Sequence, residues 1–178
     1  PTRPIVDQSA LDRAVEAVRA AERPLIVVGG GAQDAGESVQ ALAELLQAPV
    51  TTRRMGHGVI PTAHPLFVHL AIGHELWKTA DVVVAIGTRL EWPIMHWGTD
   101  DSMTIVKVDI DADELDRHSI GTIGVHGDAD DVCRALVDAL HDNASRADRT
   151  GDVAQLRDRY RAEIAHLHAF TQRGHAGH

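Results

Sequence analysis

The sequence is poor in cysteine and contains no long apolar run. Cys133 is the single cysteine among 178 residues, so an internal disulfide, a CxxC pair and a cysteine-based zinc site are excluded. No apolar stretch approaches the roughly 18 residues that a membrane-spanning helix needs. The first residues also lack the basic and apolar segments of a signal peptide. These absences predict a cytoplasmic protein with no membrane partner.

Aromatic residues and lysines are also scarce. Aromatic side chains make up 3% of the chain, which excludes an aromatic-rich platform for stacking single-stranded nucleic acid. The chain has only two lysines, Lys78 and Lys107, and its formal net charge is −9. We therefore expect no basic face for nucleic acid. With 44% hydrophobic residues, a chain of this length can still bury one sizeable core.

Apolar runs alternate with amphipathic segments along the chain. The runs at 25–28 and 82–86 are entirely apolar, which is typical of strands buried on both faces of a sheet. This alternation predicts an α/β fold, with a parallel sheet and helices on both of its faces. The expected strands are 25–28, 49–52, 81–87, 104–111 and 122–126, and the expected helices are 9–22, 37–47, 75–79, 128–140 and 153–167. A long loop rich in Gly, Pro and His is predicted over 53–69.

Parallel sheets bind ligands at the carboxyl ends of their strands, so the residues that follow the apolar runs are the candidates for a site. Gly29, Gly30 and Gly31 follow the first run and precede a helix. They would allow close backbone approach to a phosphate or ribose, or equally a tight strand-to-helix turn. The dinucleotide fingerprint is absent, because Asp34 stands where its third glycine would be, and Glu37 takes the place of the phosphate-loop lysine after Gly36.

Charged residues follow the later strands. Arg89, after Gly87, could hold a phosphate through its guanidinium fork or form a surface salt bridge. Asp109 could accept hydrogen bonds from ribose hydroxyls, whereas Asp111 is better placed to cap the next helix. Acidic residues from Asp128 onward are typical of a helix N-terminus.

No catalytic or metal-binding constellation is predicted. Five histidines lie close in sequence, but none has the spacing of a zinc motif, so solvated loop histidines are expected. They are His57, His64, His69, His74 and His96. No serine-nucleophile motif occurs, and Cys133 falls inside an amphipathic helix, where a packed thiol is expected.

Five motifs in order give the chain a family resemblance. They are RPLIVVGGG, APVTTRRMGHGVIPTAHPL, TADVVVAIGTRL, IVKVDIDADEL and VHGDADDV. Together they resemble the central domain of thiamine-diphosphate-dependent enzymes, of the acetolactate synthase and benzoylformate decarboxylase types. The resemblance runs from about Arg3 to Leu140. It implies a three-layer Rossmann-like fold (the DHS-like NAD/FAD-binding type), with a six-stranded parallel sheet.

The resemblance also implies a domain organisation and a function. Residues 1–142 would form the central domain, 143–170 a linker and connector helix, and 171–178 a disordered tail. The parent enzyme would decarboxylate or carboligate 2-oxo acids, with thiamine diphosphate and Mg²⁺ held by flanking N- and C-terminal domains. This chain would be non-catalytic in isolation, and the parent a homo-oligomer. The alternative is a free-standing nucleotide-binding or regulatory module. A sirtuin-like deacylase is not expected, because its zinc module needs four cysteine ligands and the chain has one cysteine.

In this family the central domain holds FAD, ADP or nothing. The positions that resemble the family's nucleotide contacts are Gly29, Gly30, Gly31, Gly87, Arg89, Asp109, Ile110, Gly127 and Asp128. The flavin half departs from the family pattern, because Arg53 and Arg54 replace Thr-Leu and Ile72-Gly73-His74 replaces Met-His-Gly. An adenine nucleotide is therefore expected more than a flavin. The two arginines could meet phosphates or pair with another domain.

Overall fold

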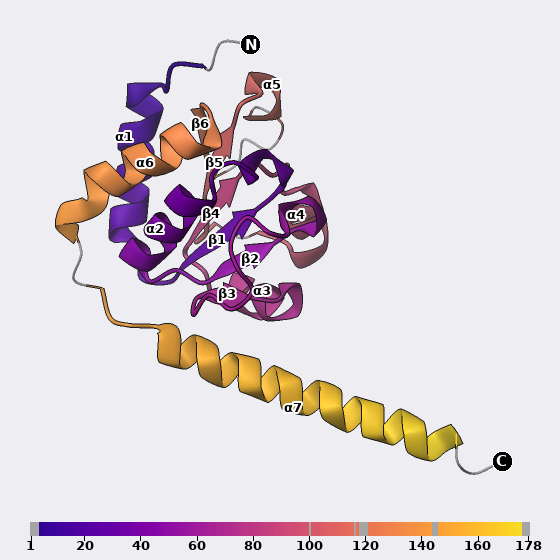
Figure 1. The fold of residues 1–178 in the computed structure, drawn as a ribbon. Helices are drawn as coiled ribbons and strands as arrows, with labels where there is room; N and C mark the ends of the chain where they lie inside the picture. Colours follow the sequence, from indigo (N-terminus) through magenta and orange to yellow (C-terminus); the bar gives the residue numbers. More distant parts are fainter. Residues whose placement is uncertain (1–3, 100, 116, 118–120, 144–145, 176–178) are drawn as a thin grey trace.

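The computed structural model describes residues 4–99, 101–115, 117, 121–143 and 146–175. Its centre is a six-stranded sheet in the order β3-β2-β1-β4-β5-β6, in which every pair of neighbours is parallel (Figure 1). This confirms the predicted α/β class and the six-stranded sheet. The strands are β1 Pro24–Val28, β2 Val50–Thr52, β3 Phe67–Val68, β4 Val82–Ile86, β5 Thr104–Asp109 and β6 Thr122–His126.

The apolar runs form strands because the sheet is buried on both faces. In β1, Ile26 and Val28 pack in one core cluster, while Leu25 and Val27 pack in a second cluster on the opposite face. Successive side chains of a strand point to opposite faces, so an all-apolar strand satisfies two cores at once. Continuous rather than alternating apolar patterns were therefore the correct signal for β1 and β4.

Helices cover both faces of the sheet. The first core cluster lies beneath α1 (Gln8–Ala20), α2 (Gly36–Leu46) and α6 (Ala129–Leu140). The second cluster contains Trp77 from the end of α3 (Leu70–Trp77) and Leu90, the residue just before α4 (Glu91–Trp97). Short α5 (Ala112–Leu115) contacts β5 and β6. The result is the expected three-layer arrangement.

The segment predicted as one long loop, 53–69, contains regular elements. Two 3₁₀ turns lie at the carboxyl edge, η1 (Gly30–Ala32) and η2 (Arg54–Gly56), and η2 belongs to this segment together with strand β3. The helix predicted over 75–79 begins earlier in the structure, at Leu70. Gly and Pro obscured these elements, because β3 has only two residues and α3 carries Gly73 inside it.

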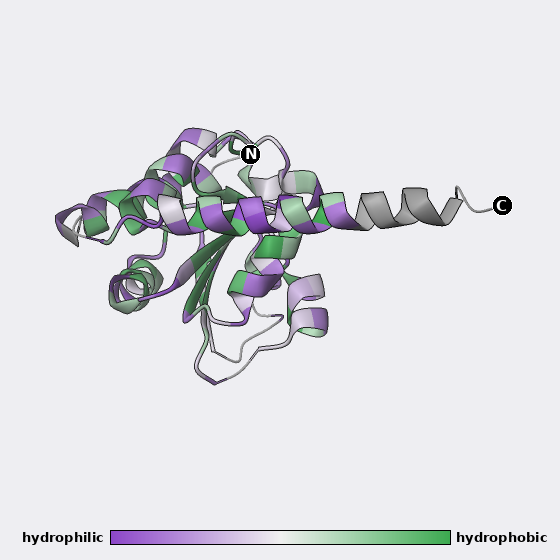
Figure 2. Cartoon of the chain, turned by 90° about the horizontal axis from the view of Figure 1, so that it is seen from below, coloured by the Kyte–Doolittle hydropathy of each residue, from purple (hydrophilic) through white to green (hydrophobic). Residues whose placement is uncertain are grey.

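The C-terminal helix α7 (Thr150–His175) crosses the body and projects beyond it (Figures 1 and 2). It follows η3 (His141–Asn143) and residues 146–149. The expected tail, 171–178, overlaps this helix up to His175, and 176–178 lie outside the described residues. Within the described part of the chain, no helix has the length and apolar character to cross a membrane.

Candidate functional site

The loops at the carboxyl ends of the strands are joined to each other by backbone hydrogen bonds. The Gly29 amide donates to the Ile86 carbonyl at 3.0 Å and the Gly31 amide to the Gly87 carbonyl at 3.0 Å. The Gly87 amide in turn donates to the Val108 carbonyl at 2.9 Å. The structure therefore brings the predicted glycines of β1 and β4 together at one edge.

Gly87 shows why these loops need glycine. Its φ is +58°, and a Cβ there would lie 2.4 Å from the carbonyl carbon of Gly31. A Cβ on Gly31 would lie 2.8 Å from the Cα of Gly87. Contact between the two loops thus accounts for these glycines without a ligand, which supports the tight-turn interpretation. Gly30 and Gly31 are both exposed at this edge.

The acidic residues after β5 fold into successive turns. One Asp109 carboxylate oxygen accepts from the Asp111 amide at 3.0 Å, and Asp111 accepts from the Asp113 amide at 3.0 Å. Asp111 therefore occupies the helix-capping position that the sequence predicted. Between them, Ile110 is 56% exposed, an unusual position for a large apolar side chain.

Gly127 and Asp128 connect β6 to α6. The Gly127 amide donates to the Asp109 carbonyl at 3.0 Å, so this bond joins the carboxyl ends of β5 and β6. Asp128 is the N-cap of α6, and its side chain accepts from the amides of Asp130 and Asp131. Capping satisfies helix amides that would otherwise lack partners. The structure thus gives Asp128 a role in the fold.

Arg89 is tied to a buried carboxylate. Its Nε lies 3.4 Å from Oε1 of Glu114, whose side chain is 8% exposed. The Nε of Arg117 lies 3.4 Å from the same oxygen, and Lys107, itself 2% exposed, donates to the Glu114 carbonyl at 2.5 Å. Oε2 of Glu114 is buried without a hydrogen-bond partner. The salt-bridge interpretation of Arg89 therefore holds, although 66% of its side chain remains exposed.

Arg53, which follows β2, contacts an aromatic side chain that lines a hollow. The Arg53 guanidinium lies 5.0 Å from the ring centre of Trp92, a cation–π contact. Trp92 stacks on His96, and Trp97 stacks on His74. A hollow of about 640 Å³ opens beside them. Its lining residues are His57, His69, Leu70, Ala71, His74, Trp92, Trp97, Tyr160 and Ile164.

The clustered histidines have separate roles. His64 is 8% exposed, lies 3.1 Å from Glu44 and accepts from the Leu66 amide, so the prediction of a solvated loop histidine was wrong there. Its partners hold the turn that precedes β3. His57 bonds to the Thr52 hydroxyl at 3.2 Å. Among the described residues, no group of three potential ligands is arranged to hold a metal ion.

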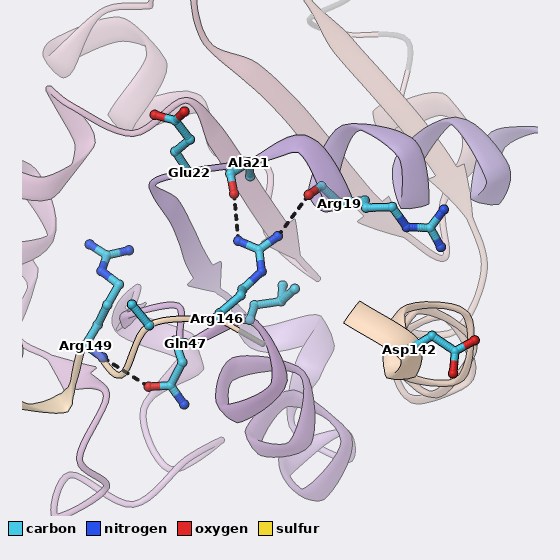
Figure 3. Close-up of a pocket in the computed structure, with 9 residues that line it drawn as sticks. Arg19, Ala21, Glu22, Gln47, Asp142, Arg146 and Arg149 are labelled. Atoms are coloured by element: carbon cyan, nitrogen blue, oxygen red, sulfur yellow. Dashed lines mark hydrogen bonds between the residues drawn. The ribbon is translucent and has the colours of Figure 1, made fainter. Parts of the chain in front are cut away.

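A second hollow, of about 420 Å³, lies at the amino ends of the strands, opposite the glycine loops (Figure 3). The Arg146 guanidinium occupies it and donates to the carbonyls of Val18 at 2.6 Å and Ala21 at 2.7 Å, at the end of α1. The Arg149 amide donates to the Gln47 side chain at 3.2 Å. Partial burial lowers the pKa of both guanidiniums. Sequence reasoning missed these residues, because they lie in a segment that reads as a polar linker.

Comparison with known proteins places these features in a family. Residues 11–136 match the family model described as "Thiamine pyrophosphate enzyme, central domain". The chain is 34% identical over 178 residues to a probable 2-ketoarginine decarboxylase of Pseudomonas aeruginosa, covering 97% of this chain and 32% of that protein. It is 30% identical to the acetolactate synthase isozyme 1 large subunit of Escherichia coli, covering 75% of this chain and 25% of that protein.

A solved structure supports the fold. The benzoylformate decarboxylase of Polynucleobacter necessarius aligns with a TM-score of 0.68 at 18% identity, covering 84% of this chain and 30% of that one. The chain spans about a third of the length of the first two curated relatives that it matches.

Proposed function

Since the chain belongs to the family of thiamine pyrophosphate enzyme central domains, we propose that its parent protein decarboxylates or carboligates a 2-oxo acid. The match over residues 11–136 carries this proposal. It is supported by relatives named as a decarboxylase, an acetolactate synthase and a sulfoacetaldehyde acetyltransferase. Thiamine diphosphate (the same compound as thiamine pyrophosphate) and Mg²⁺ belong to the N- and C-terminal domains of the parent, a cytoplasmic homo-oligomer. This chain contributes architecture and no catalytic residue.

The test uses the complete reading frame from which the chain derives. We expect the full protein to release CO₂ from, or join, a panel of 2-oxo acids with thiamine diphosphate and Mg²⁺, and the 178-residue chain alone to do neither. A reading frame that ends at the limits of this chain would contradict the proposal. It would favour the free-standing nucleotide-binding or regulatory module instead.

We further propose that the carboxyl edge holds an adenine nucleotide. Exposed Ile110 beside Asp109 supports this, because it offers an apolar surface for a base next to a carboxylate for a ribose. Adjacent strands lie about 4.8 Å apart, so the exposed Gly30 at the end of β1 lies roughly 10 Å from β5, a span suited to a diphosphate. Gly87 and Arg89, which follow β4 between them, border the same path.

The ring of a flavin dinucleotide would lie farther along, towards β2 and β3. There the Arg53 guanidinium already covers one face of Trp92. These residues fit a nucleotide such as ADP better than a flavin, and Arg53 and Arg54 are proposed as the phosphate-side cations of that edge. When bound, the nucleotide would supply binding energy and no chemistry.

A thermal-shift panel tests this site. We expect millimolar ADP to raise the melting temperature and Asp109→Ala to abolish the shift. Asp113→Ala is the matched control, because Asp113 lies in the same acidic turn and its side chain is exposed on α5. No shift with ADP, FAD or coenzyme A would contradict nucleotide binding and leave the domain purely architectural.

A further inference from the structure

The hollow beside Trp92 is lined mainly by rings, and we call it the aromatic hollow. Its volume of about 640 Å³ is in the range of pockets that hold small organic ligands. The rings come from the segment after β2, from α3 and its N-cap, from α4 and from α7. In chain order they are His57, His69, His74, Trp92, Trp97 and Tyr160. Such a lining offers ring faces and edges against which a planar ligand can pack.

Contacts outside the aromatic hollow hold its lining in place. Trp97 packs edge-on against Trp77, with 5.5 Å between ring centres, and Trp77 is 1% exposed in the second core cluster. On the other side, Arg157 of α7 donates to the carbonyls of His64 and Phe67 next to β3. A ligand would therefore enter a hollow whose lining is already ordered, which lowers the entropic cost of binding.

Three histidines of the aromatic hollow have ring nitrogens without protein partners. Among the described residues, nothing forms a hydrogen bond or ion pair with the rings of His69 and His74, which contact Phe67 and Trp97 by ring packing. His57 uses only Nδ1, on the Thr52 hydroxyl. A neutral imidazole donates one hydrogen bond, so these rings have donors left for a ligand.

The charges around the aromatic hollow favour an anionic ligand. Of the described residues that line it, none is Asp or Glu. The acids next to the lining in sequence, Glu75 and Glu91, are each paired with an arginine. The guanidinium of Arg53 lies 5.0 Å from the ring centre of Trp92 and forms no ion pair within the described part of the chain. A chain of net charge −9 thus has a hollow that is bordered by a cation and free of carboxylates.

We propose that the aromatic hollow binds a planar aromatic carboxylate of one or two fused rings. The ring packs among the tryptophans and Tyr160, and the carboxylate accepts hydrogen bonds from His69 and His74. An uncharged ring would leave these donors unused, and an aromatic cation would be repelled by Arg53. This inference requires neither the proposed 2-oxo acid chemistry nor nucleotide binding at Asp109 and Ile110.

The first experiment uses the unmodified 178-residue chain and probes that share one ring system. Isothermal titration calorimetry at pH 7 compares 2-naphthoate, 2-naphthylmethanol and 2-naphthylmethylamine. We expect the carboxylate to bind roughly tenfold more tightly than the alcohol, because hydrogen bonds to a charged group are the stronger ones, and the amine to bind most weakly. Decahydro-2-naphthoate, which lacks the aromatic ring, should bind about fivefold more weakly than 2-naphthoate. Shifts of the indole N–H signals of Trp92 and Trp97 in NMR spectra locate the ligand.

The second experiment removes the imidazole nitrogens. His69→Phe combined with His74→Phe keeps both rings, so we expect the affinity for the alcohol to stay the same and the preference for the carboxylate to fall to about twofold or less. His141→Phe is the matched control, because His141 is an exposed histidine outside the hollow that pairs with Asp142. It should keep the full preference.

Four outcomes would overturn the proposal. Equal binding of the three probes, or tighter binding of the amine, would show that the hollow does not select an anion. NMR shifts that leave Trp92 and Trp97 unaffected would place the ligand elsewhere. Tighter binding of riboflavin than of 2-naphthoate would assign the hollow to a flavin. An unchanged preference in the double variant would remove the imidazoles from recognition, and if that variant does not fold, the probe series on the unmodified chain still decides.

Discussion

The segments that connect the strands are held in different ways at the two ends of the sheet. At the carboxyl end, loops contact one another through glycine backbones, and charged side chains such as Arg89 remain largely exposed. At the amino end, arginine side chains bind backbone carbonyls directly, as Arg146 does at the end of α1. Close backbone contact between glycines holds the carboxyl end, whereas arginine side chains hold the amino end.

This difference bears on which end of the sheet has side chains left to contact a ligand. The amino-edge hollow in Figure 3 contains three arginines, yet Arg146 and Arg149 already have protein acceptors. A ligand there would have to displace these contacts. At the carboxyl edge, Ile110 and the outer part of Arg89 face solvent. We therefore expect a ligand at the carboxyl edge, the end that parallel sheets ordinarily use.

The largest effect on stability is expected from a substitution that breaks the glycine contact at the carboxyl end. Gly87→Ala places a Cβ 2.4 Å from Gly31 at a φ of +58°, so we expect a loss of at least about 4 kcal/mol in the free energy of unfolding. Urea denaturation followed by tryptophan fluorescence measures it. Gly151→Ala is the control, because nothing lies within 4 Å of its Cβ position. Equal stability of the two variants would contradict the packing argument.

A buried thiol in the interior between the two ends makes the stability of the fold depend on pH. Burial raises the pKa of the Cys133 thiol from 9.0 to about 12, so the folded state favours the protonated form. The resulting stability is complete below pH 9 and is lost as the pH rises towards 12. We expect the free energy of unfolding to fall by roughly 1.4 kcal/mol per pH unit in that window. Cys133→Ala should lack this component. If urea denaturation from pH 8 to 11 gives the same pH dependence of the free energy of unfolding for Cys133→Ala and the wild-type chain, the prediction is wrong.

At the amino end, Arg146→Ala should cost about 2–3 kcal/mol, because it leaves the Val18 and Ala21 carbonyls without their charged donor. Arg13→Ala serves as the matched control. Arg13 is an exposed residue of α1 that bonds only to Ser9 among the described contacts, so we expect a change within about 0.5 kcal/mol. Denaturant midpoints at constant slope give both values. A neutral Arg146→Ala would remove the distinction between the two ends.

The smallest effect sharpens the assignment of the carboxyl-end acids. Asp128→Ala should cost about 1 kcal/mol because it removes the α6 cap, whereas Asp128→Asn should be nearly neutral because asparagine caps comparably well. Thermal and urea unfolding of the two variants tests this. If Asp128→Asn is as destabilised as Asp128→Ala, the charge rather than the capping geometry matters at this position.

Much of the fold was predictable because its strongest signals are local. The all-apolar runs of β1 and β4 and the amphipathic stripe of α6 determine the central sheet and one covering helix. β3 and α4 were not predicted, since a two-residue strand and a seven-residue helix are too short for periodicity to appear. Their positions depend on packing against β2 and the second core cluster.

The candidate site was predicted less completely. Following the strand ends located the glycine loops, Arg89 and Asp109, because parallel sheets gather these positions at one edge. The partners that hold them were not accessible to sequence reasoning. Glu114 lies 25 residues after Arg89 in a segment that signals only a helix start, and Arg146 contacts residues more than 120 positions away. Such contacts depend on tertiary geometry rather than on local pattern.

The partners of Arg146 and Arg157 have an evolutionary consequence. Arg146 and Arg157 bind main-chain oxygens, which every amino acid provides, so the side chains at those body positions can diverge without losing the contact. A segment held in this way can remain attached to its domain while the surrounding sequence diverges. Transplanted onto a related domain with the same turns, it should dock without redesign of the recipient surface.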